Sequence, residues 1–231
     1  ATIAGLADDY TTTQTVSGTG NNYSFHQEVT LTAPAIDGHT FDKWTLNDVE
    51  VTEGLGTTDA GLHTLTIRVP STGVSYVANY TVNNVQLSSI IDADDIATGY
   101  TLATDDVITG TGVLNGENAF HSVIVLTAPV IDGHTFAEWT YTGIAESAVT
   151  VNGNSISFRM PSSRVDAKAN YTVNGNLSVG ATIAGLADDY TTTQTVDGIG
   201  NNYSFHQEVT LTAPAIDGHT FDKWTLNDVE V

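Results

Sequence analysis

Apolar and polar residues alternate strictly over several short stretches of this chain. In residues 29–33, Val-Thr-Leu-Thr-Ala, apolar side chains take every second position and threonines lie between them. Residues 65–69 and 74–82 show the same alternation, as do their counterparts near residues 124, 156 and 165. A period of two puts one set of side chains on a core face, which predicts half-buried β-strands. Because no segment has apolar positions at helical spacing with capping residues, the pattern predicts an all-β fold.

Turn signals separate the predicted strands. Asp37-Gly38, Asp132-Gly133 and Asn152-Gly153 are dipeptides that tolerate positive φ and are typical of tight turns. The Ser-Thr-Gly sequence at residues 71–73 lies between two alternating stretches, so residues 65–69 and 74–82 are predicted to form a hairpin. Phe41 and Trp44 are three residues apart, which predicts a bulge or bend in their strand.

The whole pattern is repeated along the chain. Residues 1–51 return as residues 181–231 with two differences, Ser17/Asp197 and Thr19/Ile199. A more diverged copy lies between them, because residues 31–44 and 126–139 share Leu-Thr-Ala-Pro followed by Asp-Gly-His-Thr-Phe-x-x-Trp. Such copies fold as units that stack on their neighbours. We therefore predict one repeat at residues 1–83, a second at 84–176 and a partial third copy at 177–231.

The third copy has no counterpart of residues 62–82 in this sequence. Either the natural chain continues or a neighbouring chain completes that repeat. The polar joints at residues 83–86 and 174–176 are short, which predicts close neighbours and an elongated, stiff rod.

The predicted core consists of side chains on the apolar faces of these strands and of the aromatic residues near the turns. A tryptophan that closes the core is the main interpretation of Trp44, and an exposed aromatic platform for a sugar ring is the alternative. The predicted core residues are Val29, Leu31, Phe41, Trp44, Leu65, Ile67, Ala78, Tyr80, Leu126, Phe136, Trp139, Phe158, Tyr171, Phe221 and Trp224.

The order of these motifs resembles the divergent internalin B-repeat family of bacterial extracellular proteins. The resemblance rests on Val-x-Leu-x-Ala, Asp-Gly-x-x-Phe-x-x-Trp, a strand ending in proline, and Ala-x-Tyr, and it covers most of both complete repeats. His39 and His134 stand where the family usually has an aromatic residue. The resemblance implies small sandwich-like or β-grasp-like modules, display on the cell surface, a spacer or adhesive role, and no catalytic residue. The matching residues are Val29, Leu31, Ala33, Gly38, Phe41, Trp44, Pro70, Ala78 and Tyr80, with Leu126, Ala128, Gly133, Phe136, Trp139, Pro161, Ala169 and Tyr171.

Composition narrows the classes of partner. With 6 Lys+Arg against 27 Asp+Glu the chain has a formal charge of −21, which repels phosphate backbones and anionic lipids and argues against nucleic acid as a partner. There is no cysteine, so disulfide and thiolate chemistry are excluded. The chain has no run of about 18 apolar residues, so we predict no membrane insertion in this segment. We expect a segment of a longer exported protein, extracellular or on the cell surface.

Few residues suggest metal binding, catalysis or glycosylation. Asp92, Asp94 and Asp95 offer hard oxygen ligands for a calcium ion, although an acidic surface without ions is the simpler interpretation. The recurring pairs His26/His39 and His121/His134 are better explained as turn and surface residues than as metal ligands. No catalytic constellation is recognisable, so we expect no enzyme activity and no cofactor other than calcium. Candidate glycosylation sequons begin at Asn22, Asn79, Asn170, Asn176 and Asn202.

These patterns favour a structural role over recognition. The main hypothesis is a repeat segment of an extracellular fibre, filament or surface stalk, whose partners are neighbouring modules or chains. The alternative is an adhesin-type module that binds a glycan or protein through loops such as residues 18–23 and 110–119.

Overall fold

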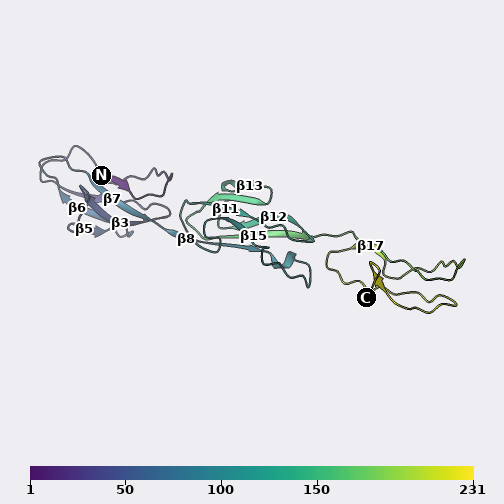
Figure 1. The fold of residues 1–231 in the computed structure, drawn as a ribbon. Helices are drawn as coiled ribbons and strands as arrows, with labels where there is room; N and C mark the ends of the chain where they lie inside the picture. The colour runs from purple at the N-terminus through teal and green to yellow at the C-terminus, as the bar shows by residue number, and fades with distance from the viewer. The chain divides into compact units, whose positions relative to one another are not determined.

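The computed structural model describes all 231 residues and contains short β-strands joined by turns and irregular segments (Figure 1). Strands make up 41% of the chain and helices 3%, so the fold is all-β, in tandem repeats, as predicted. The two helical segments are 3-10 turns of three residues each, η1 (Ala93–Asp95) and η2 (Glu146–Ala148). No helix has the length and apolar character needed to cross a membrane.

The first repeat folds as two sheets that enclose one core. One sheet has the order β1-β7-β3-β4 and the other β2-β6-β5, and β1 is parallel to β7 whereas the other pairs are antiparallel. In Figure 1, β3 and β7 run alongside one another near the N-terminus. The strands are β1 (Thr2–Ala4), β2 (Glu28–Thr32), β3 (His39–Leu46), β4 (Val49–Glu50), β5 (Leu55–Thr57), β6 (His63–Arg68) and β7 (Tyr76–Val82).

The second repeat also folds as two sheets. Its sheets have the orders β10-β8-β15-β12 and β13-β14-β11-β9. Strand β8 again runs parallel to the last strand of the repeat, from Val165↔Leu87 to Ala169↔Ile91. The strands are β8 (Asn84–Ile91), β9 (Thr109–Thr111), β10 (Gly116–Ala119), β11 (Val123–Thr127), β12 (His134–Thr142), β13 (Thr150–Asn152), β14 (Ser155–Arg159) and β15 (Val165–Val173).

The third copy forms only two small sheets of two strands each. They pair β16 (Leu177–Val179) with β17 (Gly200–Tyr203), and β18 (Thr225–Leu226) with β19 (Val229–Glu230). Here the expectation that Phe221 lies in a core is wrong, because its side chain is 55% exposed. Trp224 is half-buried. The reason is that this copy has no strands equivalent to β6 and β7, which cover these rings in the first repeat.

The other predicted core side chains lie inside the two complete repeats. Phe41, Ile67 and Phe136 are half-buried. Strand β3 has a register shift between Phe41 and Lys43, which is the predicted irregularity and turns Trp44 into the core. Ten are less than a tenth exposed: Val29, Leu31, Trp44, Leu65, Ala78, Tyr80, Leu126, Trp139, Phe158 and Tyr171.

The predicted hairpin of residues 65–69 and 74–82 is wrong. Strand β6 pairs with β2 and β5, whereas β7 belongs to the other sheet and pairs with β1 and β3. The connection between them therefore crosses from one sheet to the other. Both strands show apolar alternation because each contributes one face to the shared core, and alternation by itself does not identify a strand's partner.

Contacts along the chain define two compact units. One comprises residues 1–91, 107–129 and 138–169, and the other residues 92–106, 130–137 and 170–231. The division passes through the second repeat, so the units do not coincide with the repeats. The repeat boundaries at residues 83 and 176 stay a prediction.

Candidate functional site

An aromatic joint connects the first repeat to the second. Phe120 follows β10 and is 5% exposed, and its ring lies directly on Gly38. A Cβ on Gly38 would lie 2.2 Å from Cγ of Phe120, and the residue has φ +67°, so only glycine fits. The rings of Tyr10 and His39 contact Phe120 with centroid distances of 5.2 and 5.3 Å. We call Tyr10, Gly38, His39, Asn83 and Phe120 the first joint.

Backbone hydrogen bonds reinforce the first joint. The N–H of Phe120 donates to the carbonyl of Asn83 at 2.8 Å, and the N–H of Asn83 donates to the carbonyl of Gly38 at 2.9 Å. The hydroxyl of Thr40 donates to the side-chain oxygen of Asn83 at 2.6 Å. The short polar connection is thus tied to the turn on which the phenylalanine rests.

The same joint recurs between the second and third repeats. Phe205 lies on Gly133, where a Cβ would come within 2.1 Å of the ring, and its centroid lies 5.2 Å from Tyr100 and 5.5 Å from His134. The N–H of Phe205 donates to the Asn174 carbonyl at 2.7 Å, and the N–H of Asn174 donates to the Gly133 carbonyl at 2.8 Å. We call Tyr100, Gly133, His134, Asn174 and Phe205 the second joint. Because every contact recurs, the joint is a property of the repeat.

The ring nitrogens of the joint histidines contact backbone groups rather than a metal ion. Nε2 of His39 accepts from the N–H of Ala7 at 2.9 Å, and Nδ1 lies 2.7 Å from the carbonyl of Asp37. Only the neutral ring with its proton on Nδ1 satisfies both contacts. His134 makes the equivalent contacts with Ala97 and Asp132. Both nitrogens of each ring are therefore already used.

The histidine that follows each phenylalanine adopts positive φ, +66° at His26 and His121 and +60° at His206. The N–H of His121 donates to the Met160 carbonyl at 2.7 Å, which fixes the turn that presents Phe120. Partial burial, and then the positive charge of Arg159, lowers the pKa of His121. An uncharged ring suits a position at the edge of an apolar contact.

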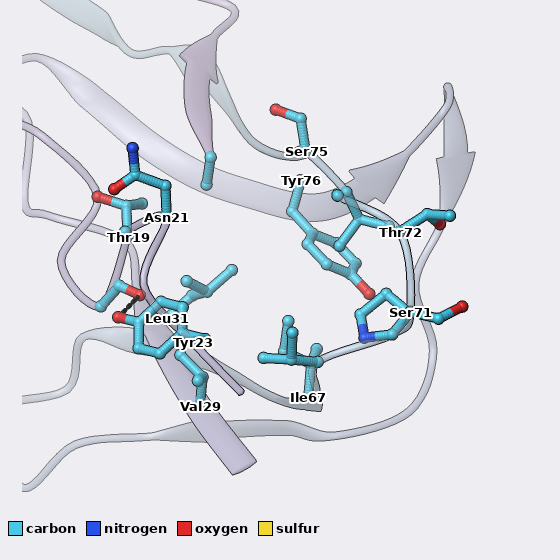
Figure 2. Close-up of a pocket in the computed structure, with 17 residues that line it drawn as sticks. Thr19, Asn21, Tyr23, Val29, Leu31, Ile67, Ser71, Thr72, Ser75 and Tyr76 are labelled. Atoms are coloured by element: carbon cyan, nitrogen blue, oxygen red, sulfur yellow. Dashed lines mark hydrogen bonds between the residues drawn. The ribbon is translucent and has the colours of Figure 1, made fainter. Parts of the chain in front are cut away.

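A hollow of about 630 Å³ opens on the first repeat, and Figure 2 shows Tyr23 and Tyr76 on opposite sides of it. The Tyr23 hydroxyl is tied back to the carbonyl of Gly18 at 2.8 Å. The floor includes Val29, Leu31 and Ile67, and the rim consists of loop residues 18–21 and 70–75.

In the second repeat the equivalent place is filled by protein. Strand β8 pairs with β10 along residues 84–87 and with β15 along residues 87–91, and its Val85 and Leu87 are buried. In the first repeat, the shorter strand β1 pairs only with Val77–Asn79 of β7. This pairing corresponds to the last part of the β8–β15 pairing. The hollow therefore corresponds to the position that β8 occupies in the second repeat, and this correspondence explains its shape.

Two of the three acidic residues proposed for calcium accept hydrogen bonds from backbone N–H groups. The carboxylate of Asp95 accepts from the N–H of Tyr171 at 2.8 Å, and Asp92 caps η1 by accepting from the N–H of Asp94 at 3.3 Å. No group of three or more acidic or histidine side chains is arranged to hold a metal ion. The calcium site therefore rests on the sequence alone.

The candidate sequons lie in different settings. Asn22, Asn176 and Asn202 are exposed, whereas Asn79 and Asn170 are half-buried within β7 and β15. The side-chain nitrogen of Asn79 donates to the hydroxyl of Thr45 at 3.0 Å. A glycan on that nitrogen would disrupt this contact, so exposed sequons are better acceptors.

Sequence reasoning missed the joints. Phe25, Phe120 and Phe205 each precede a histidine and stand at the same place in all three copies, outside the alternating strands. That recurrence was the available signal. It was not sufficient to find the contact, because Gly38 lies 82 residues before Phe120 in the sequence and was explained as a turn.

Comparison with known proteins identifies the repeats. The model of the divergent InlB B-repeat domain matches residues 9–84, 100–175 and 189–231, one match for each copy. No curated protein and no solved structure matches the chain. Since the matched residues cover well over half of the chain and coincide with the three copies, this protein belongs to the divergent InlB B-repeat family.

Proposed function

We propose that this chain is a non-catalytic structural segment of an extracellular surface protein, in which the repeats act as a spacer of defined length. The observation that carries the proposal is the joint, whose ring contacts and hydrogen bonds occur twice with nearly the same distances. A connection that buries an aromatic ring and ties down the linker restricts bending between neighbours. Membership in a family of surface repeats supports the extracellular location.

Stiffness of the native chain tests the spacer role. The absence of cysteine allows dyes to be placed at will, for example in Asn22→Cys/Asn227→Cys, both on exposed positions. Single-molecule energy transfer is expected to give one narrow distance distribution, which broadens when Phe120→Ala and Phe205→Ala are added. A broad distribution in the chain with intact joints would contradict the spacer role. Antibody labelling of intact, unpermeabilised source cells tests the location separately.

The alternative role as an adhesin has one supporting observation. The hollow in the first repeat is lined by loop 18–23, which carries Asn21 and Tyr23, and by the hydroxyl-bearing Ser71, Thr72 and Ser75. Hydroxyls and aromatic faces are groups that bind sugars. Glycan-array binding that Tyr23→Ala and Tyr76→Ala abolish would favour recognition. The strand that occupies this place in the second repeat favours the spacer.

A further inference from the structure

Three asparagines of this chain are followed directly by glycine. The backbone nitrogen that follows an asparagine can attack the side-chain amide, and glycine obstructs this attack least because it has no side chain and a flexible backbone. The structure holds the three pairs in different settings, so we expect their reactivity to differ. The pairs are Asn115-Gly116, Asn152-Gly153 and Asn174-Gly175.

Two of these pairs are restrained by strands. Gly116 is the first residue of β10, and the side-chain oxygen of Asn115 accepts from the N–H of Ser89 at 2.9 Å. Asn152 is the last residue of β13 and pairs with Ser155 of β14. Ring closure requires rotation about the bond between Cα and the carbonyl carbon of the asparagine. A paired strand holds the backbone extended and restricts that rotation.

Asn174 and Gly175 lie outside the strands, in the short connection between β15 and β16, and both are exposed. The N–H of Gly175 donates no hydrogen bond, and neither does the side-chain nitrogen of Asn174. The hydroxyl of Thr135 donates to the side-chain oxygen of Asn174 at 2.7 Å. A donor on that oxygen favours attack on the carbonyl carbon. The attacking nitrogen and the leaving group are therefore both free.

The first joint provides an internal comparison. Asn83 has the same contacts as Asn174, including a side-chain oxygen that accepts from the hydroxyl of Thr40 at 2.6 Å. The residue that follows it is Asn84, which has a side chain and is the first residue of β8. The two joints therefore differ at the attacking residue, and only the second joint has a glycine there.

We propose that Asn174 is a site of self-modification, at which its side chain loses ammonia and forms a succinimide with the nitrogen of Gly175. A bond forms between that nitrogen and Cγ of Asn174, and the bond between Cγ and the side-chain nitrogen breaks. The side-chain nitrogen leaves as ammonia and carries away the proton of the Gly175 N–H. Water then opens the ring at one of its two carbonyl groups, which gives isoaspartate or aspartate.

The second joint controls this reaction. Ring closure turns the peptide group between Asn174 and Gly175, whose carbonyl accepts from the N–H of Phe205 at 2.7 Å. That hydrogen bond has to open before the ring can close, so the rate of modification follows the opening of the joint. Either product adds a negative charge, and isoaspartate lengthens the main chain by one carbon atom. The second joint therefore changes as the protein ages, whereas the first does not.

Peptide mapping by mass spectrometry, after incubation of the folded chain at neutral pH, tests the proposal. Deamidation and isoaspartate should accumulate at Asn174 much faster than at Asn83, Asn115 or Asn152. Gly175→Asn gives the second joint the sequence of the first and should slow the reaction at Asn174 by about tenfold, since a side chain then shields the attacking nitrogen. The variant fits, because a Cβ on Gly175 would meet nothing within 4 Å.

Variants of the two joints test the control by opening. Phe205→Ala should raise the rate at Asn174 several-fold, and the matched variant Phe120→Ala, at the other joint, should leave it unchanged. Tyr100→Ala removes only one ring that contacts Phe205, so it is the milder variant and should act in the same direction.

Unfolding the chain in urea should make the three Asn-Gly pairs react at similar rates, because the restraints of the fold are then lost. A folded chain in which Asn174 reacts no faster than Asn152, or an unchanged rate in Gly175→Asn, would overturn the assignment of the site. Rates in Phe205→Ala and Tyr100→Ala that both equal the parent's would overturn the control by the joint.

Discussion

At the scale of single residues, two equivalent tryptophans differ in how their indole nitrogens are satisfied. Nε1 of Trp139 donates to the carbonyl of Asn154 at 3.0 Å. Nε1 of Trp44 is buried and has no hydrogen-bond partner. A buried polar group without a partner costs about 1–3 kcal/mol. The first repeat therefore holds its central ring at a free-energy cost that the second avoids.

Replacing each tryptophan with phenylalanine should reveal this difference. Both changes remove ring volume from a core, but Trp139→Phe also loses a hydrogen bond, whereas Trp44→Phe removes an unpaired N–H. We expect Trp139→Phe to lower the free energy of unfolding of its repeat by about 1 kcal/mol more than Trp44→Phe does. Urea-dependent hydrogen exchange of the core amides measures each repeat separately. Equal losses would show that the N–H of Trp44 finds a partner in solution.

Two buried tyrosines make stability depend on alkaline pH. Burial raises the pKa of Tyr80 to about 12, and burial together with the negative charge of Asp106 raises that of Tyr171 to about 12. The hydroxyl of Tyr80 donates to the carbonyl of Pro34 at 2.5 Å. Since the ordinary tyrosine pKa is about 10, the fold favours the neutral form of both side chains.

Their contribution to stability should be constant below pH about 10 and lost as the pH rises from about 10 to about 12. Tyrosinate absorbance should show that the ionisation of Tyr80 and Tyr171 is delayed and coincides with unfolding. Tyr80→Phe should remove one of these two ionisations. Unfolding complete before any late ionisation would contradict this assignment.

At the scale of elements, the same sequence takes two structures in one chain. Residues 28–32 and 39–46 form β2 and β3, whereas the identical residues 208–212 and 219–226 contribute only the short β18. In the first repeat these strands pair with β6 and β7. The third copy has no such strands in this sequence, so its alternating segments lack partners for their backbone groups.

Hydrogen exchange should separate these identical segments. Amides of residues 29–46 should be strongly protected, and those of residues 209–226 should exchange several orders of magnitude faster, because their hydrogen bonds to partner strands are missing. Mass spectrometry of matched peptides measures this difference in protection. Because the two segments have the same sequence, their intrinsic exchange rates are nearly equal. Comparable protection would show that the third copy is completed, for example by a second chain.

At the scale of the whole molecule, charge opposes compactness. The net charge of −21 at neutral pH is distributed among 27 acidic and only 6 basic residues. The ion pairs are exposed, as in Arg159–Asp9 at 3.5 Å and Lys43–Glu50 at 3.6 Å, and such pairs add little stability. Most carboxylates therefore repel one another across the surface.

Sodium chloride should consequently stabilise the protein. Raising the ionic strength shortens the Debye length to about 3 Å at 1 M, which screens this repulsion. The midpoint of thermal unfolding is expected to rise by several degrees between low and molar salt, and a neutral osmolyte at equal water activity should raise it less. An unchanged midpoint would mean that self-repulsion does not limit stability.

The sequence by itself determined the strands, the repeats and the family. Alternation identified β2, β6 and β7, and the turn dipeptides and the irregularity at Phe41 to Trp44 were predicted correctly. These features depend on residues close together in the chain. The same patterns occur again in each repeat. Local periodicity indicates which face of a strand is buried, even when the strands that pair with it are unknown.

Only the tertiary structure decided which strands pair and which rings meet. It placed β6 and β7 in different sheets, set Phe120 on Gly38, and left Phe25 and Phe221 exposed although each has a covered or half-buried counterpart in another repeat. These outcomes depend on residues far apart in the sequence or on strands that one copy lacks. The physical reason is that burial is a property of the surroundings, so identical residues have different environments wherever their neighbours differ.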